Sequence, residues 1–108
     1  FKNCRALTSI NLSSSLTTIG PNAFEDCRTL TSIDIPSTVT EIGADAFGSC
    51  SLLETVTVRA TTPPTLGVRA FSSTSPNLVI YVPAESVETY KAASGWSTYA
   101  SKIQAIPA

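Results

Sequence analysis

A pattern that recurs every 23 residues limits this chain to very few architectures, because Phe1, Phe24 and Phe47 each begin a similar stretch. Each stretch reads Phe-x-x-Cys-x-x-Leu-x-x-Ile/Val-x-Leu/Ile/Val, and a second half adds Leu/Val, Ile, Gly and Ala. A fixed period in this range predicts a solenoid, in which each repeat unit stacks on its neighbour. The other recurring columns are Cys4/Cys27/Cys50, Leu7/Leu30/Leu53, Ile10/Ile33/Val56, Leu12/Ile35/Val58, Leu16/Val39, Ile19/Ile42, Gly20/Gly43 and Ala23/Ala46.

Within one unit, the residues predict a short strand followed by turns. Residues 32–35 alternate polar and apolar, which is typical of a strand whose two isoleucines face inward. Pro36 ends the strand because it has no N–H to donate, and Gly43 marks a turn. The spacing of apolar residues over 46–50 predicts a single helical or 3₁₀ turn. The predicted fold class is therefore an α/β solenoid with short parallel strands and a core that runs along the whole stack.

The end of the chain departs from the repeat. Residues 59–65 replace the second half of a unit and carry two prolines, which a central strand excludes. Residues 67–71 restore the Gly-x-x-Ala-Phe signature, and residues 78–83 predict a last strand. We therefore predict repeats over residues 1–83, with the first unit truncated and the last irregular, in a single domain with a helical C-terminal cap over residues 84–108. Helical spacing predicts two short helices in that cap, at Val87/Tyr90 and at Trp96/Tyr99/Ile103.

Composition excludes several classes of function. The chain of 108 residues has 43% hydrophobic and 14% charged residues and a net charge of -1. It therefore lacks the clustered Lys and Arg that nucleic acids and anionic membranes require. No segment approaches the roughly 20 apolar residues of a membrane-spanning helix, and no signal peptide is visible. Because the sequence opens at Phe1, inside a repeat, we expect it to be a fragment that lacks its natural N-terminal part and any export signal.

The three cysteines occupy one column, at Cys4, Cys27 and Cys50. This regular spacing predicts buried, reduced thiols that act as small hydrophobic residues. Stacked units would place neighbouring cysteines roughly 5 Å apart, so geometry does not exclude one disulfide.

Other candidates for chemistry are few. The chain has no histidine, which removes the usual base near neutral pH and the commonest transition-metal ligand. The cysteine spacing lacks the close pairs of a zinc site. Glu25-Asp26 is interpreted as a solvated edge, and Asn11-Leu12-Ser13 as a chance match to the glycosylation sequon. We predict no catalytic residue, no metal ligand, no cofactor site and no enzymatic activity.

The outward positions of the strands are the candidate binding face. Solenoids commonly use such an extended face for partners. Tyr81 is either an exposed aromatic anchor or a side chain that packs against the cap. Arg59 and Arg69 flank the Pro63-Pro64 loop, either as polar contacts for a partner or as solvated charges. The candidate residues of the face are Ser9, Asn11, Ser32, Asp34, Thr55, Thr57 and Tyr81, and Val79 completes one column.

Residues 19–36 read Ile-Gly-Pro-Asn-Ala-Phe-Glu-Asp-Cys-Arg-Thr-Leu-Thr-Ser-Ile-Asp-Ile-Pro, and the motif recurs from Ile42 to Val58. This motif resembles the BspA-like leucine-rich repeats of bacterial surface proteins. The resemblance implies a right-handed leucine-rich-repeat coil with a parallel sheet along one face. It also implies export to the bacterial surface or medium, and non-enzymatic binding of proteins or glycans. The alternative is a structural spacer or C-terminal cap of a longer surface protein whose binding residues lie upstream.

The first unit predicts one further property. Phe1, Leu7, Ile10 and Leu12 have no preceding unit in this sequence to cover them. We expect exposed apolar surface and an unpaired strand edge at this end, and therefore end-to-end self-association.

Overall fold

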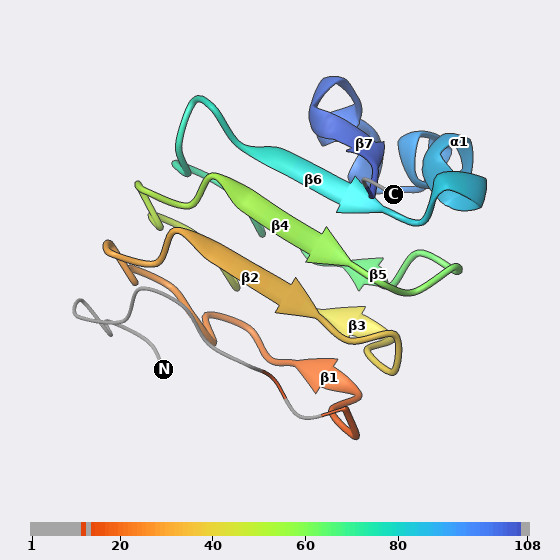
Figure 1. The fold of residues 1–108 in the computed structure, drawn as a ribbon. Helices are drawn as coiled ribbons and strands as arrows, with labels where there is room; N and C mark the ends of the chain where they lie inside the picture. The colour runs from red at the N-terminus through yellow and green to blue at the C-terminus, as the bar shows by residue number, and fades with distance from the viewer. Residues whose placement is uncertain (1–11, 13, 107–108) are drawn as a thin grey trace.

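The computed structural model describes residue 12 and residues 14–106, whose strands form two parallel sheets (Figure 1). The larger sheet has the order β2-β4-β6-β7, and the smaller has the order β1-β3-β5. The strands of the larger sheet are β2 (Ser32–Ile35), β4 (Thr55–Val58), β6 (Val79–Val82) and β7 (Ile103–Ala105). Those of the smaller sheet are β1 (Thr18–Ile19), β3 (Glu41–Ile42) and β5 (Thr65–Leu66).

Consecutive units are in register, so that equivalent residues lie side by side. Ile33 pairs with Val56, and Val56 pairs with Ile80, in the larger sheet. In the smaller sheet Ile19 pairs with Ile42, and Ile42 pairs with Leu66. The strand predicted over residues 32–35 is present, and the predicted second half of the unit contributes a strand of its own. The chain therefore has a repeat α/β fold with parallel strands in two sheets.

A third line of hydrogen bonds joins the turns between the sheets. In these turns a backbone N–H of one unit donates to a carbonyl oxygen of the next unit. This arrangement satisfies buried backbone groups that no strand reaches. The bonds are Asn22 to Ala44 (2.9 Å), Phe24 to Ala46 (2.7 Å), Asp26 to Gly48 (2.8 Å), Asp45 to Val68 (3.0 Å), Phe47 to Ala70 (2.8 Å) and Ser49 to Ser72 (2.8 Å).

Residues 46–50, for which a single helical or 3₁₀ turn was predicted, lie in hydrogen-bonded turns. Cys50 N–H donates to the Phe47 carbonyl oxygen at 3.3 Å, which is the bond of a single turn. Asp45, before this turn, and Ser49, within it, have positive φ angles of 56° and 60°, and a helix cannot continue through that conformation. The same conformation recurs in the equivalent residues of each unit, at Asn22/Asp45/Arg69 and Asp26/Ser49/Ser73.

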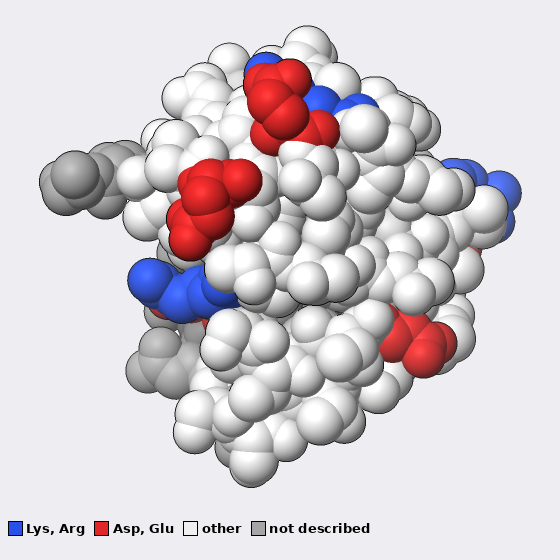
Figure 2. Space-filling model, turned by 90° about the vertical axis from the view of Figure 1, so that its right-hand side faces the viewer, with Lys and Arg blue, Asp and Glu red and all other residues white. Residues whose placement is uncertain are grey.

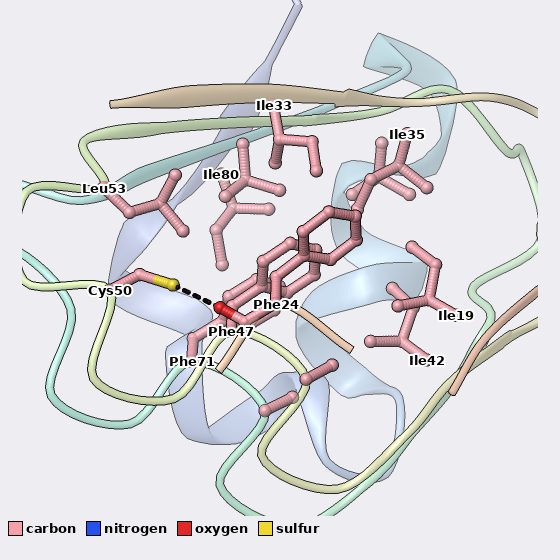
Figure 3. Packing of buried hydrophobic residues seen from close by; sticks show 14 of the residues in the cluster. Ile19, Phe24, Ile33, Ile35, Ile42, Phe47, Cys50, Leu53, Phe71 and Ile80 are labelled. Atoms are coloured by element: carbon pink, nitrogen blue, oxygen red, sulfur yellow. Dashed lines mark hydrogen bonds between the residues drawn. The ribbon is translucent and has the colours of Figure 1, made fainter. Parts of the chain in front are cut away.

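The core consists of the recurring apolar columns (Figure 3), together with Tyr90, Trp96 and Ile103 of the C-terminal segment. Phe24, Phe47 and Phe71 form a stack whose ring centroids are 5.2 and 5.4 Å apart and whose rings lie within 6° of parallel. The prediction that the apolar residues of the unit at 24–46 face inward is confirmed. These buried residues are Phe24, Cys27, Leu30, Ile33, Ile35, Val39, Ile42 and Ala46.

The C-terminal segment contains η1 (Ala84–Ser86), α1 (Val87–Ala92) and η2 (Trp96–Lys102), followed by β7. The prediction that Ile103 shares a helical face with Trp96 and Tyr99 is wrong. Ile103 begins β7, which pairs with β6 in parallel and places Ile103 beside Ile80 (Figure 1). The strand forms because β6 would otherwise present a row of unpaired backbone groups, and an alternating apolar segment satisfies them.

Side chains of the cap replace the backbone of a further unit. Thr40 lies beside Pro64, and the Thr40 carbonyl oxygen accepts a bond from the Thr65 N–H (3.0 Å). The equivalent carbonyl oxygen of Pro64 accepts its hydrogen bond from a side chain instead, the indole Nε1 of the buried Trp96 (2.8 Å). In the same way the Tyr99 hydroxyl accepts the Phe71 N–H (3.3 Å).

The cap also forms hydrogen bonds to the irregular loop over residues 59–64. The Tyr90 hydroxyl donates to the Ala60 carbonyl oxygen (2.5 Å), and the Ser86 hydroxyl donates to the Thr61 carbonyl oxygen (2.7 Å). These donors come from the segment that begins directly after β6. The loop that interrupts the repeat is therefore the surface on which the cap is held.

The glycine column sets how closely units approach. A Cβ on Gly43 would lie 2.4 Å from the Pro21 nitrogen, and one on Gly67 would lie 2.2 Å from the Ala44 nitrogen. Both contacts are with backbone, which cannot rotate away. The column therefore needs glycine for backbone proximity, since only Gly95 among the described glycines has a positive φ.

We predict that Gly43→Ala destabilises the protein by about 1–3 kcal/mol or more, because the two units must separate. Gly20→Ala is the matched control, since a Cβ there meets none of the described residues within 4 Å. Its effect should stay within about 1 kcal/mol, in the stabilising direction, because alanine restricts the unfolded chain. Urea denaturation of both variants measures the difference. Equal stabilities of the two variants would show that backbone contact does not limit the spacing of the units.

Candidate partner-binding face

The outward residues of the larger sheet form two lines across the strands. Their inward neighbours are buried, and the outward side chains are half-buried or exposed. We call these residues the outer face. The first line is Ser32, Thr55 and Val79, and the second is Asp34, Thr57, Tyr81 and Gln104. The structure thus brings together every predicted residue of this face except Ser9 and Asn11, which lie outside the described residues.

Gln104 is a member of the outer face that the sequence prediction missed. It lies beside Tyr81 because β7 pairs with β6. A helix was expected there, so its exposed amide was not considered. The signal was the apolar-polar-apolar order of residues 103–105, which is typical of a strand.

Asp34, at one end of the second line, forms an ion pair with Arg59. Arg59 donates from Nε to Asp34 Oδ1 and from Nη2 to Asp34 Oδ2, both at 2.8 Å. These bonds raise the pKa of the Arg59 guanidinium further above its ordinary value. Both side chains are about half exposed, at 52% and 50%, so the pair contributes less than about 1 kcal/mol to stability. Its effect on the face is to orient the Asp34 carboxylate.

Arg69 lies elsewhere and forms a similar pair. Its Nε and Nη2 donate to the two carboxylate oxygens of Asp45, each at 3.2 Å. Each arginine thus pairs with an aspartate of the preceding unit. The two do not form a common cationic patch, and Figure 2 shows one face on which charged residues are scattered among uncharged ones.

Tyr81 lies between Thr57 and Gln104, on a half-buried position of the outer face. The cap does reach it, because the backbone of β7 runs alongside. The aromatic side chains of the cap, however, contact one another and Phe71. Their ring contacts are Phe71–Trp96, Phe71–Tyr99 and Tyr90–Trp96. The ring of Tyr81 is therefore placed beside polar side chains at the centre of a line that extends over four strands.

The cysteine column is part of the core. Cys27 and Cys50 are free thiols with no exposed surface, as predicted, and Cys4 lies outside the described residues. The Cys50 thiol donates to the Phe24 carbonyl oxygen at 3.0 Å (Figure 3). Burial raises the pKa of Cys50 from 9.0 to about 12, so its thiolate is disfavoured as a nucleophile or metal ligand. Within residues 14–106 no three His, Cys, Asp or Glu side chains are grouped to hold a metal ion.

The raised pKa of Cys50 predicts alkaline sensitivity. The folded state holds the thiol proton more tightly than the unfolded state, whose pKa is near 9.0, so this stabilisation is complete below pH 9 and is lost between pH 9 and about pH 12. We expect the stability advantage of the parent protein over Cys50→Ala to shrink by about 1.4 kcal/mol per pH unit in that window. Urea denaturation at a series of pH values measures it. A constant difference up to about pH 11 would contradict the prediction.

Comparison with known families identifies the repeat. The model of the BspA type leucine-rich repeat region (6 copies) matches residues 1–94, which is most of the chain. No curated protein matches the sequence. The family match confirms the resemblance that the motif over residues 19–36 suggested. Among the described residues, no helix has both the length and the apolar character to span a membrane.

Proposed function

The chain belongs to the BspA-type leucine-rich repeat family, and on that basis we propose that it is a non-enzymatic interaction domain of a bacterial surface or secreted protein. The partner is a protein or a glycan, and it binds the outer face. We further propose that the repeat units wind as a right-handed solenoid, because connections between parallel strands of one sheet are right-handed in nearly all proteins.

The observation that carries this proposal is the line Asp34–Thr57–Tyr81–Gln104. Four side chains with different hydrogen-bonding properties stand on four adjacent strands, about 4.8 Å apart, on a rigid sheet. A carboxylate held by Arg59, a hydroxyl, a phenol and an amide give donors, acceptors and one aromatic surface. A rigid aromatic among polar groups is the usual composition of a binding hot spot.

The structural alternative has support of its own. The cap closes the stack with the side chains of Ser86, Tyr90, Trp96 and Tyr99, which is what a terminal segment of a longer repeat protein must do. A spacer, however, has no need for the varied polar line on the outer face.

We predict that Asp34→Ala, Thr57→Ala and Tyr81→Ala together lower partner capture at least about tenfold, because the hot spot is removed. The protein is tested on an array of glycans and on a panel of purified extracellular-matrix proteins. The control variant carries Glu88→Ala and Thr89→Ala, at exposed positions of α1. If the triple variant captures the same ligands as the parent protein, binding does not lie on the outer face and the structural alternative is favoured.

Self-association at the N-terminal end is a separate proposal. The predicted apolar residues Phe1, Leu7 and Ile10 lie outside the described residues. Within the described part of the chain, β1 is an edge strand with β3 as its neighbour. An edge strand presents unpaired backbone groups that favour association. We expect the apparent mass from light scattering to rise with protein concentration, and a strict monomer at high concentration would refute self-association.

A further inference from the structure

The irregular loop after β4 encloses a hollow against the preceding unit. This hollow has a volume of about 320 Å³, and we call it the loop hollow. Ligand sites usually have volumes of about 300–1,000 Å³, so its size suits a small group. It is lined by residues 59–64 together with Ser37, Val39 and Thr40.

The cap holds the wall of the loop hollow in place. The carbonyl oxygens of Ala60, Thr61 and Pro64 each accept a hydrogen bond from a buried side chain of the cap. A loop that is already anchored does not have to be ordered when a ligand binds, which lowers the cost of binding.

One backbone acceptor of the loop hollow has no partner. At the preceding interface, the Leu16 carbonyl oxygen accepts a bond from the Thr38 hydroxyl of the next unit at 2.5 Å. Val39 is equivalent to Leu16, and its carbonyl oxygen accepts no hydrogen bond from the described residues. Pro63 and Pro64, which precede β5, have no N–H to offer it. The Val39 carbonyl oxygen is therefore available to a donor on a ligand.

Arg59 supplies donors to the same hollow. Its Nε and Nη2 hold the Asp34 carboxylate, whereas its Nη1 has no partner in the described part of the chain. The exposed hydroxyls of Ser37, Thr61 and Thr62 can each donate and accept.

A second hollow, of about 220 Å³, connects this region with the outer face. Arg59 lines both hollows, and Asp34 and Pro36 line the second with Leu12 and Ser14. Because Asp34 also belongs to the second line of the outer face, a ligand held at Arg59 can extend onto that face.

The chemistry of the lining suits an uncharged ligand that carries hydroxyl groups. Arg59 and Asp34 are the only charged residues that line the two hollows, and they neutralise each other. An acidic or basic ligand would therefore meet no unpaired charge. The rest of the loop hollow combines hydroxyls with apolar surface from Val39, Ala60 and the two prolines. A sugar ring has the same combination, with hydroxyls at its edge and C–H groups on its faces.

A peptide fits this place less well than a sugar. Extended peptides bind chiefly by main-chain hydrogen bonds to the edge of a sheet. Pro63 and Pro64 have no N–H, so this part of the loop cannot form such a pairing. The loop hollow thus favours a ligand that is recognised by hydroxyl groups.

We propose that the loop hollow binds one sugar residue of a neutral glycan, an inference that rests on the proposed function and selects the glycan from its two classes of partner. One hydroxyl of the sugar donates to the Val39 carbonyl oxygen, and another accepts from Arg59 Nη1. A C–H face of the ring packs against Pro63. The rest of the glycan passes Asp34 toward the outer face.

The test titrates the whole ¹⁵N-labelled protein with the methyl glycosides of glucose, galactose, mannose and fucose. We expect at least one of them to shift the amide resonances of residues 60–62, with a dissociation constant of about 1–10 mM. No shift with any of the four up to about 100 mM would overturn the proposal. Equal or tighter binding of methyl glucuronide or of capped triglycine at these amides would also overturn it, because the site would then prefer an acidic sugar or a peptide.

Two arginine variants locate the effect. Arg59→Ala should weaken glycoside binding at least about tenfold, because a charged donor is lost, while the fold is kept. Arg69→Ala is the matched control, since it removes a similar pair with Asp45 and lines neither of the two hollows. Unchanged binding by Arg59→Ala, or equal losses in the two variants, would contradict a sugar site at Arg59.

A variant with Thr57→Ala and Tyr81→Ala separates this site from the outer face. It should keep the glycoside shifts, because neither residue lines either hollow. If it also captures larger partners as the parent protein does, the outer face fails as a binding site while the sugar site stands. If it loses capture but no glycoside shifts the parent protein, the sugar site fails while the outer face stands.

Discussion

The close approach of backbone to backbone between consecutive units is the constraint on which the rest of this structure depends. At Gly43 and Gly67 the space for a Cβ is already taken by the preceding unit. This proximity allows three lines of hydrogen bonds, one in each sheet and one through the turns, to join the same two units. Once these bonds fix the spacing, the side-chain columns must stack, as the rings of Phe24 and Phe47 do at 5.2 Å. The 23-residue period of the sequence is therefore the length of chain that returns each backbone group to its partner.

The lines of hydrogen bonds between units must end at the last unit. The C-terminal cap ends them with side chains as well as with a strand. Along β6 the termination is by backbone, because β7 continues the sheet. Along the smaller sheet and the turns it is by the indole of Trp96 and the hydroxyl of Tyr99, which act as single donors or acceptors. Side chains can satisfy isolated positions but cannot reproduce a continuous backbone. Between these two side chains, Gly95 packs closely against Leu66, where an added Cβ would lie 3.1 Å from the Leu66 carbonyl oxygen.

The structure of the repeated units could be predicted from the sequence, whereas part of the structure after the last repeat could not. Inward positions such as Ile33 and Ile35 could be assigned because the same apolar pattern occurs in every unit, and the outer face follows from them by alternation. β7 could not be predicted in this way, because residues 103–105 belong to no column and their partner is decided by the open edge of β6. Gln104 was missed for that reason. Similarly, the bond from Trp96 to Pro64 joins residues 32 apart with no periodic relation, and only the folded loop brings them together. Asn22 and Asp45 are residue types that tolerate a positive φ, but Arg69 adopts it because its unit must match theirs.

The residues of the outer face can change in evolution without loss of the fold. The second line of the outer face consists of side chains at Asp34, Thr57, Tyr81 and Gln104, which are not part of the core, so each can be replaced while the backbone hydrogen bonds beneath are unchanged. Recognition there depends on which side chains are present. The spacing between units is instead set by backbone contact at the glycine column. The specificity of the outer face is therefore free to vary while the distance between units stays the same.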